Sequence, residues 1–585
     1  MMDRIKVMEN RLSAQEKRRL ERVYAPQVVG THPSNTWADL CVMPDGEIRY
    51  YGHDEYGRFY LSSTDCGFTW KRYDVEDLSL MAAGQRHPQT HRWFNSCYVK
   101  GEGGFFNNEI PTVPEGLDGW QAALSDEGPG GSVRWVKVAD GTFLPRLPHF
   151  LSSGRIILAG QIPAQPPEIK QHPALALSDD NGESWRIVEL EPAPAHEAGG
   201  LHKSVRWQNG SCEPTIVERK DGSLLMIART SQDYHYQYES FDGGETWTAP
   251  RPSPFHGTLT MPTLLRLSNG AIVLFFCNTQ PLSEVDKSTV YPKLGYGEMN
   301  GYSEDVFTNR DANHAAISFD EGKTWQGLRE LHLNTIRNSC DFRISGGNEG
   351  NDKSIHQFQA LELPFGKILL CFGQHGYTRR MIVFDPKWLL ETERSEDFRF
   401  GMEQVSTQVY IKSISGYRRK NWNGHCAWNR TNGALMMPDP DGNREEAVYI
   451  RTCNDECLYS PMQGVTWNFP AAKKGIVSVR MMAVEDGLTL SLTDRWFNPS
   501  DKDAAVQSAF TFRADKTVCP LQKWTDIEFH FDENGCDVLV NGELYTHLAP
   551  QYDAPLGLSY LLVQSEAEYT GNQGAYLKSL SMKAE

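Results

Sequence analysis

Short apolar runs separated by turn residues recur along the chain. The repeated unit is a short strand, a turn that usually carries glycine, and a second apolar run, as in CEPTIVERKDGSLLMIAR from Cys212. Related copies begin at Trp37, Arg146, Met261 and Phe358, with a weak sixth at Cys426. Repeated β-sheet units of this kind stack radially into a β-propeller. Six copies therefore predict six blades.

A second pattern, Ser-x-Asp-x-Gly-x-Ser/Thr-Trp, accompanies the first. It spans residues 63–70, 178–185, 240–247 and 318–325, and a decayed copy at 460–467 carries Met462 in place of the aspartate. Asp and Ser side chains bond the backbone of a tight turn, Gly supplies a positive φ, and Trp anchors the hairpin in the core. The pattern predicts one β-hairpin turn for each copy.

The remaining segments divide the chain into three parts. Residues 1–25 are charged and predict a solvated helix, and alternating strands from Pro470 onward predict a β-sandwich. Unequal spacing of the repeats predicts long loops over the binding face at 71–133 and 282–312. We therefore expect an all-β chain with a helix at 1–25, a six-bladed β-propeller at 26–469 and a jelly-roll sandwich at 470–585.

Composition narrows the function further. The chain holds 58 basic and 75 acidic side chains, and this net charge of −17 argues against binding to nucleic acid. The chain has no run of 18 apolar residues that would predict a membrane span. The N-terminus is charged and does not resemble a signal peptide. Twelve scattered cysteines without a CxxC pair predict reduced thiols, so we expect a cytoplasmic protein.

Sites for a cofactor or a metal are not expected. The chain has no phosphate-cradling GxxxxGK sequence and no convincing GxGxxG sequence after a strand. His87 and His91 would pair on a metal only within a helix, and the oxygen-rich segments 348–352 and 438–442 read as ordinary turns. We expect an oligosaccharide as partner and leave open a homo-oligomer.

The Ser-x-Asp-x-Gly-x-Thr-Trp turns resemble the Asp-boxes of the sialidase (neuraminidase) superfamily, and the likeness extends from about residue 30 to residue 467. It implies an exo-acting glycoside hydrolase that releases a terminal, carboxylate-bearing sugar from oligosaccharides. It also implies that the turns lie on the outer rim of the propeller, away from a central site. The segment after residue 470 resembles a concanavalin-like sandwich.

Candidate site residues lie at the ends of the innermost strands, which face the propeller axis. The strand starts offer Asp39, Arg146, Glu213, Met261, Gln359 and His425, and the strand ends offer His53, Gln161, Arg229, Asn278 and His375. The resemblance implies that Glu213 is catalytic and that Arg229 and Arg310 clamp the substrate carboxylate. For substrate binding we add Arg146, His53, Gln359 and His375.

Two departures from the superfamily keep the mechanism open. TWADL replaces the expected Arg-Ile-Pro of the first blade, and Phe358, beside His356, stands where a nucleophilic tyrosine is expected. Glu213 with Asp39 or Asp341 could instead act as the acid and base of an inverting hydrolysis. His356 or Tyr234 could transfer protons, as in propeller lyases that act on uronates. A carbohydrate-binding protein without catalysis is the third hypothesis.

Overall fold

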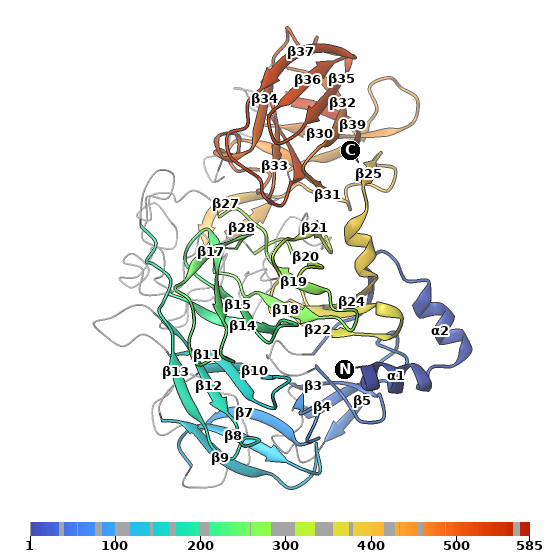
Figure 1. Ribbon diagram of the computed structural model, residues 1–585. Coiled ribbons are helices and arrows are strands. Elements are labelled where there is room, and N and C mark those ends of the chain that lie inside the picture. Colours follow the sequence, from blue (N-terminus) through green and yellow to red (C-terminus); the bar gives the residue numbers. More distant parts are fainter. Residues whose placement is uncertain are drawn as a thin grey trace.

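The computed structural model shows a chain built almost entirely of antiparallel β-sheets (Figure 1). The prediction of an all-β chain is thus confirmed, apart from a few short helices. No helix in the described part of the chain is long and apolar enough to cross a membrane. The structure describes residues 2–33, 40–54, 56–75, 85–99, 117–140, 144–162, 171–197, 210–257, 259–281, 310–333, 338, 355–373, 378–414, 428–431, 433–452, 458, 460–485, 487–565 and 574–585.

The N-terminus forms two short helices, α1 (Met2–Arg11) and α2 (Ala14–Glu21). Ser13 caps α2 through a reciprocal bond with Glu16, the capping box that satisfies two free amides. The predicted N-terminal helix is present as two helices, but one face of them is not solvated, because Leu20 is fully buried in an apolar cluster with Tyr50. The helices therefore cover one edge of the β-sheets instead of standing in water.

Six four-stranded antiparallel sheets make up the described chain from residue 27 to residue 384. Five follow chain order, with the strands β2 (Leu40–Val42), β3 (Ile48–Asp54), β4 (Gly57–Ser63), β5 (Lys71–Val75); β6 (Gln85–Arg86), β7 (Trp93–Val99), β8 (Gly119–Ser125), β9 (Arg134–Ala139); β10 (Leu144–Phe150), β11 (Ile156–Ile162), β12 (His172–Ser178), β13 (Arg186–Glu189); β14 (Cys212–Glu218), β15 (Leu224–Arg229), β16 (Tyr234–Ser240), β17 (Arg251–His256); and β18 (Thr263–Arg266), β19 (Ile272–Phe276), β20 (His314–Ser318), β21 (Gln326–Glu330).

The sixth sheet joins the two ends of this region. It contains β22 (Gln359–Glu362), β23 (Ile368–Phe372) and β24 (Arg380–Phe384), and β1 (Gln27–Gly30) pairs with β24. Buried apolar clusters join neighbouring sheets, as where Leu175 packs with Met226 and where Met381 packs with Tyr50. The sheets therefore stack face to face, and the first strand of the chain completes the last sheet.

The repeat pattern misplaced one sheet. Strands β5 to β8 lie within residues 71–133, where a long loop was expected, and residues 76–84 and 100–116 of that range lie outside the described residues. Residues 282–309 of the second expected loop also lie outside the described residues. The weak copy at Cys426 does not form a four-stranded sheet: β28 (Trp428–Thr431) pairs with β27 (Val409–Ile414) alone. The sheet β6–β9, which no copy of the repeat predicted, is the sixth four-stranded sheet instead.

Four of the five repeated turns share one hydrogen-bond pattern. In the third copy, the Thr246 amide and hydroxyl donate to the Asp242 carboxylate at 2.9 and 2.6 Å, and the Gly244 amide donates to Ser240 Oγ at 2.9 Å. Trp247 Nε1 closes the turn on the Gly244 carbonyl at 3.0 Å. The decayed copy is different, because residues 463–467 lie inside strand β31 and not in a hairpin turn.

The rest of the chain forms two larger sheets. The first has the order β29 (Leu435–Pro438), β30 (Glu446–Arg451), β39 (Gly574–Ala584), β32 (Gly475–Ala483), β35 (Trp524–Phe531), β36 (Cys536–Val540), β37 (Glu543–Leu548), with β25 (Glu393–Glu396) also on β39. The second has the order β26 (Val405–Ser406), β31 (Gln463–Ala472), β38 (Leu558–Ser565), β33 (Leu488–Thr493), β34 (Phe510–Ala514). Short helices η3 (Pro364–Gly366), η4 (Pro386–Leu390) and α4 (Ala504–Gln507) complete the fold.

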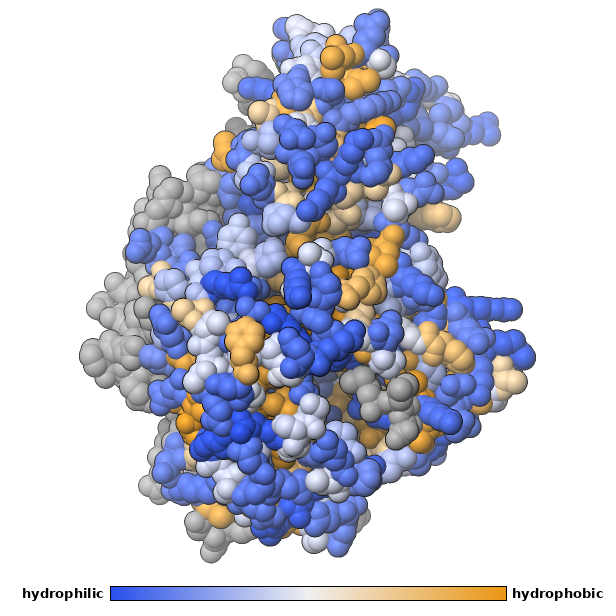
Figure 2. All heavy atoms as spheres, viewed as in Figure 1, coloured by the Kyte–Doolittle hydropathy of each residue, from blue (hydrophilic) through white to orange (hydrophobic). Residues whose placement is uncertain are grey.

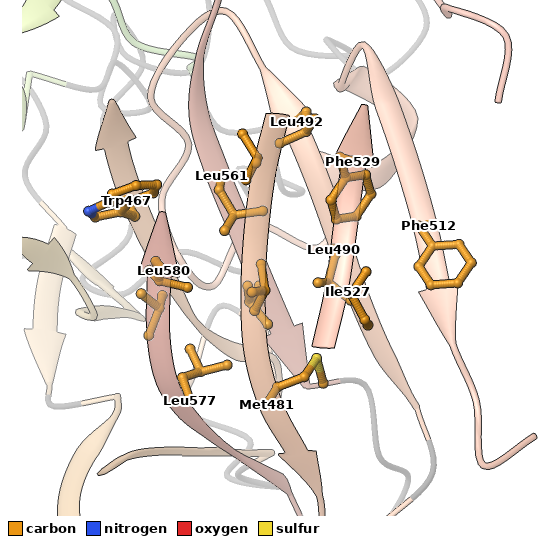
Figure 3. Packing of buried hydrophobic residues seen from close by; sticks show 14 of the residues in the cluster. Trp467, Met481, Leu490, Leu492, Phe512, Ile527, Phe529, Leu561, Leu577 and Leu580 are labelled. Atoms are coloured by element: carbon orange, nitrogen blue, oxygen red, sulfur yellow. The ribbon is translucent and has the colours of Figure 1, made fainter. Parts of the chain in front are cut away.

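These two sheets pack face to face. Trp467 and Leu561 from one sheet and Met481 and Phe529 from the other share one buried apolar cluster (Figure 3). Strand β35 alternates strictly between buried and half-buried positions, as a strand with one face on a core should. Below, "the C-terminal sheets" means these two sheets with their connections.

The C-terminal sheets lie over one end of the sheets β14–β17 and β18–β21 (Figure 1). A parallel bridge joins Thr279, just after β19, to Trp496, just after β33. Hydrophilic side chains cover most of the molecular face in Figure 2, with hydrophobic residues scattered among them. The contact between the C-terminal sheets and the sheets β14–β17 and β18–β21 lies beside the candidate site.

Candidate functional site

Glu213 lies at the start of strand β14, in a backbone conformation that few residues adopt. Its φ is 45°, and the register with β15 shifts between Cys212 and Thr215, which marks a β-bulge. A positive φ is uncommon for residues other than glycine, and bulges beside functional sites re-aim side chains. The Glu213 amide donates to Gln161 Oε1 at 3.0 Å, which fixes the bulge against the neighbouring sheet.

The re-aimed carboxylate meets a buried guanidinium. Arg229, the last residue of β15, donates from Nη1 to Glu213 Oε2 at 2.8 Å. Arg229 is 3% exposed and Glu213 is 8% exposed. Two charges this deeply buried require a partner, because an isolated ion in a protein interior is very costly. Glu213 and Arg229, which the sequence indicated for separate roles, thus form one buried ion pair.

Arg310 and His356 form a second buried pair. Arg310 is fully buried, and its Nη2 donates to the Leu259 carbonyl at 2.5 Å. Its Nη1 lies 3.3 Å from His356 Nε2, and the amide of Met261 lies 3.3 Å from the other ring nitrogen, Nδ1. Both neighbours of the ring are hydrogen donors, and a neutral imidazole accepts only one hydrogen bond in its ring plane.

This conflict has a simple chemical solution. If His356 Nδ1 accepts from the Met261 amide, Nε2 carries the proton, and its N–H lies beside the Nη1–H groups of Arg310. Two donors 3.3 Å apart can share one acceptor, and an anionic oxygen is the strongest acceptor available. The pair is therefore suited to hold a carboxylate.

The segment 256–261 links the two pairs. The Leu259 amide donates to the carbonyl of Thr230, the residue after Arg229, at 2.9 Å, while the Leu259 carbonyl accepts from Arg310. Met261, at the end of the segment, donates to His356. Leu259 itself has a φ of 51°, a second uncommon backbone angle at this place. This stretch of backbone thus holds Arg310 and His356 directly, and it also bonds Thr230, the neighbour of Arg229.

Other predicted residues have structural roles or partial exposure. Gln359 is buried, and its amide group bridges the Leu40 amide at 2.9 Å and the Tyr50 hydroxyl at 2.8 Å, so it joins two sheets. Tyr234 is 38% exposed, and its ring lies 4.5 Å from the ring of His256. Burial raises the pKa of the Tyr234 hydroxyl above its usual value.

Several predicted residues are placed only in part. Arg146 lies in β10, beside a shift in register between Pro145 and Pro148, and His53 lies in β3; their side chains are outside the description. Outside the described residues altogether are Asp39, His375 and His425. Gln161 and Met261 contribute to the site through the bonds given above, and the Asn278 amide donates to His314 Nδ1 at 3.0 Å.

His235 is a poor general base. It is fully buried against Phe276, and burial lowers the pKa of its ring to about 3. The ring is therefore neutral at physiological pH and out of contact with solvent. A lyase that used Tyr234 for proton transfer would therefore gain no general base from His235.

The described side chains that were considered as metal ligands bond to other groups of the protein. His87 lies in a turn, where its Nδ1 accepts from the backbone amides of Gln89 and Thr90, both at 3.2 Å. The ammonium group of Lys578 contacts the Asp439 and Glu445 carboxylates at the 438–442 turn. Within the described ranges, no cluster of three metal-ligating side chains is found. The other oxygen-rich segment, residues 348–352, lies outside the described residues.

Sequence reasoning missed a polar cluster contributed by the C-terminal sheets. His256 Nε2 lies 3.2 Å from the Asp494 carboxylate, which also accepts from Arg495 at 2.7 Å and from the Tyr552 hydroxyl at 2.8 Å. In addition, the Tyr410 hydroxyl bonds the Asp311 carboxylate, next to Arg310. His256 and Asp494 are 238 positions apart and Asp311 and Tyr410 are 99 apart, so no local pattern joins either pair.

Comparison with known proteins gives a consistent result. Residues 141–351 match the model of the BNR repeat-like domain. An anhydrosialidase of Macrobdella decora is 26% identical over 195 residues, which cover 29% of this chain and 24% of that protein. The match thus spans about a quarter of the relative's length.

Among solved structures, Trypanosoma rangeli sialidase in complex with sialic acid aligns over 96% of this chain and 94% of its own, at 11% identity and a TM-score of 0.33. A protein of unknown function from Dyadobacter fermentans aligns over 62% of this chain and 97% of its own, at 16% identity and a TM-score of 0.38. The family match and the Macrobdella decora relative show that the chain is similar to sialidase and BNR-repeat proteins, and the four repeated turns agree with that similarity.

Proposed function

We propose that the chain is a sialidase-like glycoside hydrolase that releases a terminal, carboxylate-bearing sugar from oligosaccharides. The observation that carries this proposal is the buried Glu213–Arg229 ion pair beside the Arg310–His356 pair, the two being linked through the Leu259 backbone and Thr230. The Arg310 guanidinium and an imidazole N–H supply directional donors for a carboxylate, which a lysine would supply less well. The similarity to sialidase and BNR-repeat proteins agrees with this chemistry.

Each side chain has a distinct part in the proposed mechanism. Arg310 and His356 hold the sugar carboxylate, and Arg229 sets the position of the Glu213 carboxylate. Glu213 takes a proton from the water that attacks the anomeric carbon, and the glycosidic oxygen leaves with a proton from an acid on the opposite side. Asp39 is our candidate for that acid, because it comes just before an inner strand. This pair would give an inverting hydrolysis.

The architecture fits the same proposal. We interpret the six four-stranded sheets as the blades of a β-propeller, with Glu213 and Arg310 at the end that faces the C-terminal sheets. We interpret the C-terminal sheets as a concanavalin-like sandwich. Strands β25, β30 and β31 pair with strands beyond residue 470, and β26 and β29 pair in turn with β31 and β30, so the second unit would begin near residue 393 and not at residue 470.

A substrate screen tests the activity. The purified chain is incubated with sialyl-, glucuronyl- and galacturonyl-oligosaccharides, and released sugar and ultraviolet absorbance are followed together. We expect release of a saturated acidic monosaccharide, lost in Glu213→Gln and in Arg229→Ala. Glu213→Gln is the more informative variant, because its amide can still bond Arg229. Circular dichroism of each variant checks the fold.

Two results would contradict the hydrolase. Ultraviolet absorbance that rises equally in the wild type and in Glu213→Gln would show elimination by a lyase instead. Binding of a sugar without any release would show a carbohydrate-binding protein. Release of a neutral sugar only would contradict the role given to Arg310 and His356.

A further inference from the structure

A buried ionic cluster lies where the C-terminal sheets meet the end of sheet β14–β17. Its centre is Asp494, whose carboxylate contacts His256 at 3.2 Å, Arg495 at 2.7 Å and the Tyr552 hydroxyl at 2.8 Å. Arg495 also donates from Nε to Gln280 Oε1 at 2.6 Å, just beyond β19. Asp494 and Arg495 of the C-terminal sheets thus contact residues at the ends of two sheets of the preceding region.

His256 is the contact that leads toward the candidate site. It is the last residue of β17 and the first of the segment 256–261, and it is 7% exposed. The next amide, that of Gly257, donates to the Asp233 carbonyl at 3.0 Å. Further along, Leu259 binds Arg310 and Met261 binds His356. One end of the segment is therefore fixed by the C-terminal sheets, and the other end holds the pair that we assign to the substrate carboxylate.

We propose that Asp494 is a positioning residue for Arg310 and His356, and that it acts through His256 and the segment 256–261. The inference rests on the proposed function, because it takes the substrate to be a carboxylate-bearing sugar. It gives the C-terminal sheets a part in substrate recognition that is separate from stability. In this arrangement the segment has the correct place only when His256 donates to Asp494.

The electrostatics of the cluster agree with this role. Burial lowers the pKa of His256, so the ring is neutral at physiological pH and carries a single N–H. Although burial opposes the charge of Asp494, the nearby His256 and Arg495 and two hydrogen bonds hold the pKa of its carboxyl below the usual value. A neutral donor therefore faces a permanently charged acceptor, and the bond persists across the neutral pH range.

Two substitutions at one position separate the hydrogen bond from the packing. His256→Phe keeps a ring against Tyr234 but removes the donor to Asp494, whereas His256→Gln keeps an N–H of similar reach. The control is Asn468→Ala, which removes a different contact between the two regions: the bond from the Glu330 amide to Asn468 Oδ1 at 3.2 Å. That contact lies at the outer strand β21, away from the segment 256–261.

The readout is binding of N-acetylneuraminic acid and of its methyl ester, measured by titration calorimetry on the full chain. We expect His256→Phe to weaken binding of the acid about tenfold, the loss of one well-placed charge-assisted contact, and to change binding of the uncharged ester much less. His256→Gln should restore most of the loss. Asn468→Ala should leave the ratio of the two affinities unchanged even if it lowers the melting temperature.

The outcomes separate this inference from the proposed function. Equal effects of His256→Phe on acid and ester, or no effect on either, would overturn the inference even if the wild type hydrolyses sialosides. Discrimination as expected, in a wild type that releases no sugar, would support the inference and contradict the hydrolase. A wild type that binds neither ligand would overturn the substrate class on which both rest.

Discussion

Glycine in place of Glu213 should destabilise sheet β14–β17 less than alanine does. Both substitutions remove the partner of buried Arg229, at a cost of about 3–5 kcal/mol for breaking a buried pair. They differ only in the methyl group at a φ of 45°. That methyl costs roughly 1–2 kcal/mol in the left-handed region, while glycine costs about 0.4–1 kcal/mol through the greater freedom of its unfolded chain. The net advantage of Glu213→Gly is then about 1 kcal/mol.

Hydrogen exchange of the β14 to β16 amides is the suitable assay. At about 2.1 cal/mol/K per residue, 1 kcal/mol would move the melting temperature of a cooperative 585-residue chain by only about 1 °C. Local exchange reports the opening of one sheet, and a difference of 1 kcal/mol corresponds to about fivefold in rate. We therefore expect about fivefold slower exchange in Glu213→Gly than in Glu213→Ala.

Thr215 in the same strand gives the matched control. It has no positive φ, so glycine there should be less stable than alanine by about 0.5–1 kcal/mol, the reverse of the order at Glu213. If Glu213→Ala exchanged as slowly as Glu213→Gly, the backbone at this position would not be strained. The interpretation of the bulge as a device that aims the carboxylate would then fail.

Three further predictions follow from the packing and the charges. Hydrogen bonds from Arg266 lower the pKa of Glu321 to about 2, so its contribution to stability is complete above the unfolded pKa of about 4.3 and is lost as the pH falls toward 2. Melting curves at pH 5 and pH 2.5 should therefore differ less in Glu321→Gln than in the wild type, and equal differences would contradict this. Leu20→Ala should cost about 2–5 kcal/mol in urea unfolding, because the side chain is fully buried, and a cost below 1 kcal/mol would show that α2 is not packed. Burial raises the pKa of Cys66 to about 12 and of Cys519 to about 11, so peptide mapping should find both unlabelled by iodoacetamide at pH 8 until urea is added.

Local chemistry explains which parts of the fold could be predicted. The four regular turns were found because each one satisfies its bonds within eight residues, as from Ser240 to Trp247. The sheet β6–β9 was missed because its turn is stretched, from Ser125 to Trp135. Ser125 Oγ accepts from the Gly128 amide at 3.1 Å, and Gly128 has a φ of 94°, so the same chemistry occurs at a longer spacing. A search that allowed insertions would have found it.

The same reasoning explains the errors near residue 465. The segment from Ser460 to Trp467 keeps the glycine and tryptophan of the pattern, but Met462 cannot accept the two bonds that the aspartate accepts elsewhere. Without those bonds the segment is free to continue as strand β31, whose Trp467 packs in the core of the C-terminal sheets. The aspartate therefore decides whether this sequence forms a turn.

The site was predictable only where a single hairpin brings its members together. Glu213 and Arg229 are sixteen residues apart because β14 runs away from the site and β15 returns to it. Arg310 and His356 belong to different sheets, so the sequence indicated each of them separately but not their contact. Asp494 lies 238 positions from His256, and only the packing of the C-terminal sheets brings them together.

The position of the site at the strand ends explains why the segment 256–261 carries so many contacts. Beyond the last ladder bond, backbone carbonyls and amides have no strand partner, so they are available to buried side chains. The Leu259 carbonyl meets the buried cation Arg310, and the Leu259 amide meets the strand end beside Arg229. A shift of this one residue would move two cations at once. Substrate recognition in this chain should therefore be more sensitive to changes in the segment, and to the Asp494 contact that anchors it, than to equal changes in any single blade.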